Sequence, residues 1–209
     1  VPIMHMNNRK KIWIGSLSVL IICASVYPVL GTQARASTRF DPLPGTLDGT
    51  AFMRSAVYRD INGPINLETD YDGIRWLKIN IKGSPVILEG VTPQYRWGSR
   101  ISVYTGLPTV VGWKWHQEQQ RWGYRGDVLK RHSDVDIIYS TSDSEKALGL
   151  MYKYGVEYVY VGQLERLYYP EKGIAKFDGA LSDHLTPVFR SPNVIIYRLQ
   201  PRATLQSTS

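Results

Sequence analysis

The chain has 209 residues, of which 43% are hydrophobic and 21% charged, an ordinary globular composition that excludes wholesale disorder, collagen and coiled-coil repeats. Its single cysteine excludes an internal disulfide and a cysteine-based zinc or iron–sulfur cluster. The net charge is +7, but residues 1–40 hold five basic and no acidic residues, which leaves an excess of two positive charges over the other 169. So weak an excess does not indicate nucleic acid as a partner.

Residues 12–30 form the strongest pattern, nineteen uncharged and mostly apolar residues. At 1.5 Å per residue, a helix of this length nearly matches a hydrocarbon core of about 30 Å. Trp13 and Tyr27 suit the two interfacial belts, and Pro28 and Gly31 suit the exit of the helix. The sequence therefore predicts a transmembrane helix over 12–30, with the membrane as a partner.

Two other interpretations of this segment stay open. A cleaved secretory signal has the same basic start and apolar run, and residues 34–36 (Ala-Arg-Ala) resemble a cleavage site. A buried helix of a soluble protein is the other. Because the basic flank, residues 1–11, precedes the helix, we expect a cytoplasmic N-terminus and residues 31–209 on the extracytoplasmic side of the cell membrane. Since Val1 is not an initiator methionine, we expect the chain to begin inside a longer polypeptide.

Beyond the helix, residues 31–66 are rich in Thr, Pro, Gly and Asp and predict a connector. Residues 70–81 show helical spacing, with Asp70 as the N-cap. The continuous apolar run at 84–90 predicts a central strand covered on both faces.

The remaining elements follow in alternation. Short alternating or β-branched runs predict strands over 100–105 and 108–112, and a helix over 143–154 leads through Gly155 into a strand. Residues 186–190 and 193–199 predict a hairpin, and 201–209 a frayed tail. The fold class is therefore α/β or α+β: one N-terminal transmembrane helix, then an exported domain over 67–200 whose mixed sheet is flanked by helices.

Catalytic motifs are missing from the sequence: it contains no phosphate-binding loop, dinucleotide-binding turn, nucleophile elbow or zincin helix. We expect no metal site and no cofactor in this segment, whereas those of a full-length protein stay unknown. The densest unusual stretch is 94–125, where aromatic, Arg, His and Glu side chains could stack on sugar rings and hold hydroxyls or phosphates. The candidate ligand-binding residues are Glu89, Tyr95, Arg100, Tyr104, Trp113, Trp115, His116, Glu118, Arg121 and Glu165.

Each candidate also has a plain structural interpretation. Glu89 and Glu165 follow predicted strands, where ligands often bind, but a salt-bridged glutamate is commoner. His116 could serve as a general acid or base, yet a histidine beside tryptophans usually makes structural hydrogen bonds. The tryptophans themselves pack in cores by cation–π contact in many scaffolds.

Several sequence strings, in order, resemble the C-terminal part of the YYY family of polytopic membrane proteins. The strings are TLDG (46–49), DYDGIRWL (70–77), GSPVILEG (83–90), RISVYTGLPTVVGWKWHQEQQR (100–121), DVDIIY (134–139), KYGVEYVYVGQLER (153–166) and AKF (175–177). That family is similar in layout to GT-C glycosyltransferases, which use polyprenyl-phosphate sugars. The resemblance implies a last transmembrane helix followed by an exported domain.

The same resemblance implies that catalytic residues lie upstream, in loops among other membrane helices, so none is expected in this segment. We expect this part to contribute glycan or acceptor recognition, with a lipid-linked sugar or glycan acceptor and membrane proteins as partners. The alternative is a membrane-anchored structural or assembly module with no catalytic role. A third hypothesis, a hydrolase using Glu89, Glu118 or Glu165, has no supporting motif.

Overall fold

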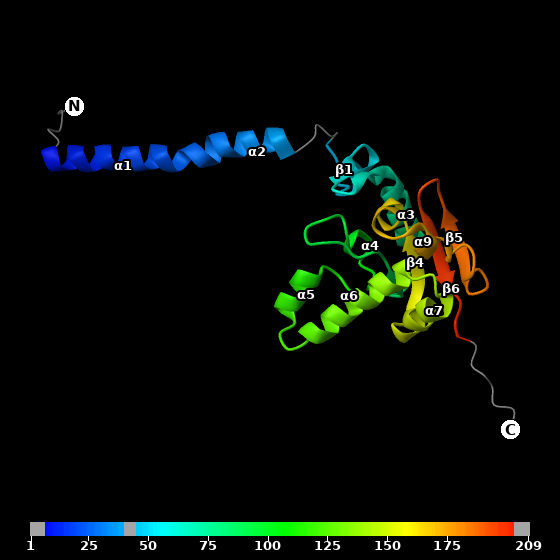
Figure 1. The fold of residues 1–209 in the computed structure, drawn as a ribbon. Helices are drawn as coiled ribbons and strands as arrows, with labels where there is room; N and C mark the ends of the chain where they lie inside the picture. Colours follow the sequence, from blue (N-terminus) through cyan, green and yellow to red (C-terminus); the bar gives the residue numbers. More distant parts are fainter. Residues whose placement is uncertain (1–6, 40–44, 203–209) are drawn as a thin grey trace, which may run out of the picture. The chain divides into compact units, whose positions relative to one another are not determined.

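The computed structural model describes residues 7–39 and 45–202, and the chain divides into two compact units, Val1–Leu47 and Asp48–Ser209. Figure 1 shows the elements of each unit in chain order. The predicted tail at 201–209 lies largely outside the described residues.

The first unit is one long helical segment. Helix α1 (Asn8–Val26) begins at Asn7, whose side chain accepts a hydrogen bond from the Arg9 amide at 3.3 Å. A π-helical turn (Tyr27–Gly31) then leads into α2 (Thr32–Arg39). Pro28 has no N–H to give, and the wider turn absorbs the missing hydrogen bond. The predicted helix exit at Pro28 and Gly31 is therefore wrong, and the segment from Asn8 to Thr38 is long and apolar enough to cross a membrane.

The second unit opens with a small hairpin rather than an irregular connector. A 3₁₀ turn (Ala51–Arg54) precedes β1 (Val57–Asp60) and β2 (Gly63–Asn66), which pair antiparallel. Helix α3 (Leu67–Asn80) follows at once. The Asn66 side chain caps this helix by accepting a hydrogen bond from the Glu68 amide at 3.0 Å. Asp70, the predicted cap, lies inside the first turn with a buried side chain.

The main sheet has the strand order β3-β4-β6-β5. Its strands are β3 (Val86–Leu88), β4 (Val156–Val161), β5 (Leu185–Arg190) and β6 (Ile195–Leu199). β3 runs parallel to β4, and the other pairs are antiparallel. The predicted hairpin near the C-terminus and the strand after Gly155 are confirmed, but β3 is an edge strand and not the central one.

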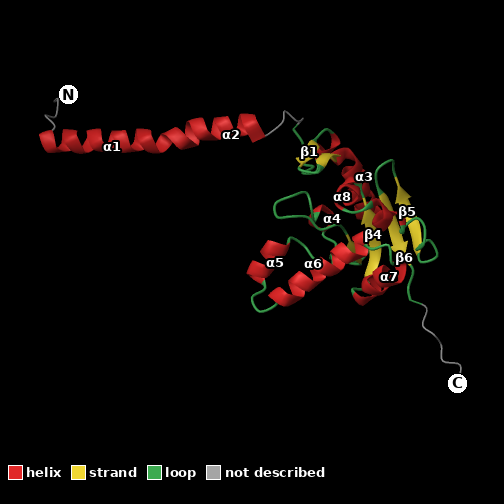
Figure 2. Ribbon diagram, in the orientation of Figure 1, coloured by secondary structure: helices red, strands yellow, loops and turns green. Residues whose placement is uncertain are grey.

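Helices cover both faces of this sheet (Figure 2). Those after β3 are α4 (Arg100–Thr105), α5 (Lys114–Gln120), α6 (Arg125–Ser140), α7 (Ser144–Lys153), α8 (Gln163–Tyr168) and α9 (Glu171–Ala175). One buried cluster joins α6 and α7 to Val159 and Val161 of β4; the other joins α3, α4 and α8 to Tyr160 of the same strand. Alternate side chains of one strand thus reach opposite cores, and the predicted mixed sheet flanked by helices is confirmed.

Two predicted strands are wrong. Residues 100–105 form α4, since Ile101 and Thr105 are also one helical turn apart and the alternation is equally compatible with a short helix. Of residues 108–112, only Thr109 makes an isolated bridge, to Ile87. The bridge partly covers the free edge of β3.

Candidate functional site

Two of the predicted site residues, Arg100 and Glu165, meet Asp70 in a buried charge cluster. The Arg100 guanidinium contacts Asp70 (Nε–Oδ2, 2.6 Å) and Glu165 (Nη2–Oε2, 2.9 Å), and all three side chains are at most 1% exposed. Asp70 also accepts hydrogen bonds from the Trp97 indole at 2.8 Å and the Tyr160 hydroxyl at 2.9 Å. The cluster therefore fastens α3, α4, α8 and β4 to one another.

Glu89, the fourth buried charge, caps α4 from a distance. Its carboxylate accepts the backbone N–H groups of Ile101 at 2.8 Å and Ser102 at 2.9 Å, two of the donors that a helix start leaves unpaired. A side chain twelve residues earlier thus fixes where the helix begins, which a local pattern does not reveal.

Burial and pairing move the two glutamate pKa values in opposite directions. Burial raises the pKa of Glu89. Burial would do the same at Glu165, but the Arg100 charge and hydrogen bonds from Arg100, Gly90 and Gly162 outweigh it and lower the pKa of that carboxyl below its ordinary 4.5. Because both carboxylate oxygens of Glu165 are buried and hydrogen-bonded, this cluster stabilises the fold rather than receiving a ligand.

Replacing Glu165 with glutamine tests that assignment. The ionised carboxylate contributes stability that is fully present above the unfolded pKa, near 4.5, and is lost as the pH falls through the lower folded value. We expect Glu165→Gln to reduce the free energy of unfolding by about 2 kcal/mol at pH 7 and to flatten its decline as the pH falls below 4.5. Glu157→Gln, an exposed control on β4, should leave both unchanged; an equal acid decline in both variants would refute the role of Glu165.

Four other predicted residues lie together at the surface: three exposed aromatic side chains and His116 between them. Tyr95 and Trp113 each meet the His116 ring edge-on, with centroids 5.8 and 5.4 Å away, and Trp115 lines the same shallow recess. The Trp113 indole donates to the Gly98 carbonyl at 2.8 Å. These side chains are open to solvent, not core as their structural interpretation expected.

The last three predicted residues lie in three separate environments. The Tyr104 ring packs between Phe52 and Trp97 in the second core cluster. Glu118 pairs with Arg125 at 3.0 Å and ties α5 to α6. Arg121, which ends α5, lines an open groove.

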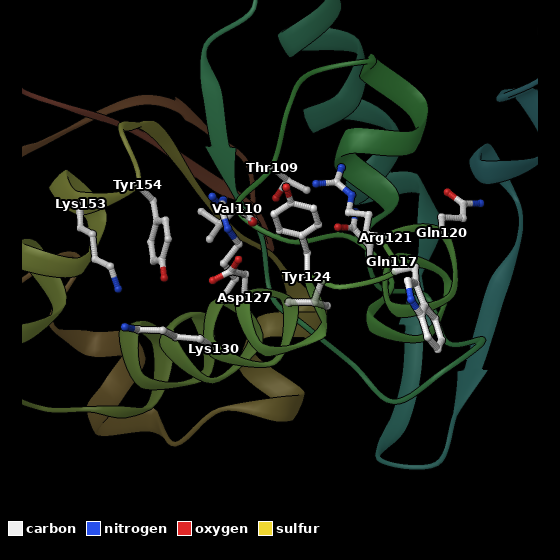
Figure 3. Close-up of a pocket in the computed structure, with 13 residues that line it drawn as sticks. Thr109, Val110, Gln117, Gln120, Arg121, Tyr124, Asp127, Lys130, Lys153 and Tyr154 are labelled. Carbon is white, nitrogen blue, oxygen red and sulfur yellow. Dashed lines mark hydrogen bonds between the residues drawn. The ribbon is translucent and has the colours of Figure 1, made fainter.

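That groove lies on the globular unit and has a volume of ≈ 950 Å³. Figure 3 shows its side chains arriving from α5, the α5–α6 loop, α6 and the end of α7. Its lining combines aromatic rings, amides, cations and one carboxylate: Gln117, Gln120, Arg121, Trp122, Tyr124, Asp127, Lys130, Arg131, Lys153 and Tyr154, together with Thr109, Val110 and Val128.

Positive charge dominates the groove, and part of it is held in place. The Arg131 guanidinium lies 5.1 Å from the centre of the Tyr154 ring and donates to the Val110 carbonyl at 3.2 Å. Lys153 pairs with Asp134 at 2.6 Å, and hydrogen bonds from Lys153 and Tyr154 lower the pKa of Asp134 below 3.8 against the opposing effect of burial. Such fixed cations and rings favour a flat, oxygen-rich and anionic ligand.

Arg121 is the one groove residue among the candidates predicted from the sequence. Lys130 and Arg131 lie on α6, but that helix was not among the predicted elements. Its buried face combines Val128, Val135, Ile138 and Tyr139 with the charged Asp134, so the periodic signal is weak. Trp122, which is 93% exposed, belongs to the unusual stretch 94–125 but was not among the candidate ligand-binding residues.

No protein-family model matches the chain, and no curated protein is similar to it in sequence. Among solved structures, it is similar to the C-terminal globular domain of an oligosaccharyltransferase from Archaeoglobus fulgidus, with 13% identity and a TM-score of 0.40 over 62% of this chain and 95% of the other. Values this low do not establish a common function, so the family resemblance stays a prediction and the proposals below rest on the chain's own residues.

Proposed function

We propose that the globular unit recognises a glycan or glycosylated acceptor for a membrane glycosyltransferase of GT-C layout, and that the groove is the binding site. The observation that carries the proposal is the groove wall itself. Trp122 and Tyr124 offer exposed rings on which a sugar can stack, beside the side-chain amides of Gln117 and Gln120 and four cations. Rings, amides and guanidinium groups are the side chains that hold sugar faces, hydroxyls and acidic substituents.

The groove favours recognition over hydrolysis. Asp127 is the one carboxylate among the described residues that line it, whereas glycoside hydrolysis uses a pair. Glu118 is paired with Arg125, and Glu89 and Glu165 are buried, so the three glutamates of the hydrolase hypothesis do not converge on an open site.

Membrane anchoring through α1 is the second part of the proposal. The segment Asn8–Thr38 is long and apolar enough to span a bilayer, and the basic residues in its first turn favour a cytoplasmic N-terminus with the globular unit outside. The alternative function, a purely structural or assembly module, would be favoured by buried tryptophans without a hollow beside them. Trp113, Trp115 and Trp122 are instead exposed, and Trp122 lines the groove.

A binding measurement on the full chain in detergent tests this function. A glycan microarray covering neutral and acidic oligosaccharides identifies the best probe, and calorimetry with that probe then compares variants. We expect Trp122→Ala to weaken binding about tenfold, since ring stacking contributes roughly 1.4 kcal/mol. Lys130→Gln should weaken an acidic probe about threefold to tenfold, because it removes a cation from the wall.

Lys82→Gln is the matched control, because it removes the same charge from an exposed position outside the groove. It should bind as the parent chain does. Failure of every oligosaccharide to bind, or equal affinity in the Trp122, Lys130 and Lys82 variants, would refute the groove as a glycan site.

A further inference from the structure

Every exposed aromatic side chain in the described part of the globular unit lies between Tyr95 and Tyr124. The five are Tyr95, Trp113, Trp115, Trp122 and Tyr124, with exposed fractions from 37% to 93%. We call this set the aromatic lobe. Figure 1 shows α5, which carries or flanks four of them, at one end of the globular unit and away from the sheet. Because clusters of exposed tryptophans are unusual on the surface of a soluble protein, their concentration in one lobe indicates that the lobe binds another molecule or a membrane.

The charge of the same stretch narrows the chemistry of that partner. Between residues 95 and 125, the exposed or half-exposed cations are Arg96, Lys114, Arg121 and Arg125, and the one acidic residue is Glu118. Glu118 is already engaged by Arg125 at 3.0 Å, so the lobe presents a positive excess among its rings. Tryptophan, tyrosine and basic side chains together are the composition of a membrane interface.

The backbone segments that carry the aromatic lobe lie at the surface. Helix α5 has no buried residue and packs mainly against α6. Tyr95 adopts a left-handed backbone conformation with φ of 58°, which turns the chain at the edge of the shallow recess. The aromatic rings therefore stand on short, surface segments rather than in a core.

The apolar helix of the same chain would hold the globular unit close to a bilayer. Helix α2 (Thr32–Arg39) is polar and adds about 12 Å beyond the apolar run at 12–30. Nine residues then separate Thr38 from Asp48, the first residue of the globular unit. Even fully extended, this stretch spans no more than about 35 Å. A unit tethered so closely meets the lipid surface at a high effective concentration, so modest affinity suffices.

We propose that the aromatic lobe docks on the surface of an anionic bilayer, with its rings at the level of the lipid headgroups. The inference rests on the membrane anchoring proposed above. Each basic side chain near an anionic surface contributes about 1 kcal/mol, and the rings bury apolar area at the interface. Docking would bring the adjoining groove next to the membrane, since Trp122 and Tyr124 belong to both.

Fluorophore labelling of the full chain in lipid vesicles tests the docking. Cys23 is the native and single cysteine, within α1, so an environment-sensitive dye on it reports whether the helix is inserted. On a Cys23→Ser background, Trp115→Cys and Tyr95→Cys report on the lobe. Ile61→Cys is the matched control, an exposed apolar residue in the turn between β1 and β2.

In vesicles of phosphatidylcholine and phosphatidylglycerol at 3:1, we expect iodide to quench the dyes at 23, 95 and 115 at least threefold less than the dye at 61. Pure phosphatidylcholine should reduce the protection at 95 and 115 and leave that at 23. Protection at 23 with full iodide access at both 95 and 115 would overturn docking while leaving the anchor intact.

Two other outcomes would also overturn it. Iodide access at 23 would show that the helix is not inserted, and the anchoring proposal would fail together with the docking. Protection at 95 and 115 that rises with the protein-to-lipid ratio would show that a second copy, and not lipid, covers the lobe. Glycan binding in detergent is independent of all these results, because Lys130 belongs to the groove and not to the lobe.

Discussion

Arg100→Met is expected to destabilise the globular unit by about 3–5 kcal/mol, a large share of the total for a domain of this size. The substitution keeps much of the side-chain volume but leaves two fully buried carboxylates, Asp70 and Glu165, without their cation. It also removes the charge that lowers the pKa of Glu165. Each carboxylate must then either stay buried as an unpaired charge or take up a proton, and both outcomes cost free energy.

Urea unfolding of the full chain in detergent, followed by near-ultraviolet circular dichroism, measures this loss. The matched control is Arg190→Met, because Arg190 pairs with Asp178 at the same 2.9 Å while both side chains are about half exposed. Exposed pairs contribute about 0–1 kcal/mol. If the two variants unfolded at the same urea concentration, the buried cluster would not be what fastens the helices to the sheet.

Gly173→Ala is the second substitution with a large expected effect, about 3 kcal/mol. Gly173 lies in α9, and a Cβ atom there would stand 2.2 Å from the backbone oxygen of Tyr139 and 2.7 Å from that of Ser140. Backbone atoms at the end of α6 cannot rotate away as a side chain can, so α9 must shift. The Lys176 ammonium, which donates to the Tyr139 and Gly173 carbonyls, would lose its geometry as well.

Gly149→Ala in α7 is the control for this substitution, because no atom lies within 4 Å of the added carbon. There alanine should stabilise the protein by about 0.5–1 kcal/mol, since glycine is a poor helix former. The same urea titration compares both variants. Equal midpoints for the two would contradict the close packing of α9 on α6.

These two variants also separate stability from recognition. Arg100 and Gly173 are buried and line neither the groove nor the shallow recess beside Tyr95, whereas Trp122 and Lys130 are exposed. A variant that unfolds easily loses binding through its unfolded fraction, and low temperature or osmolyte restores it. Loss of binding in Trp122→Ala at unchanged stability would instead be a property of the groove.

Patterns with a clear period were read correctly from the sequence. The apolar run at 12–30 is helical, as predicted. Pro28 does not end the helical segment, since a π turn absorbs the missing hydrogen bond. The helix before Gly155, the strand after it and the C-terminal hairpin are present because each has its own apolar pattern and turn residues. Short segments with ambiguous patterns, such as 100–105, were assigned to the wrong class.

The candidate site was predicted in composition but not in arrangement. The apolar helical segment, the mixed α/β fold class and the unusual density of tryptophan and arginine at 94–125 follow from the amino-acid sequence alone. The folded chain was needed to show that Glu89, Arg100 and Glu165 are buried and paired, and that Arg121 joins Lys130, Arg131 and Lys153 around one groove. The physical reason is that local periodicity depends on neighbours a few residues apart, whereas burial and charge pairing depend on contacts such as Asp70–Arg100 and Arg100–Glu165, 30 and 65 residues apart in the chain.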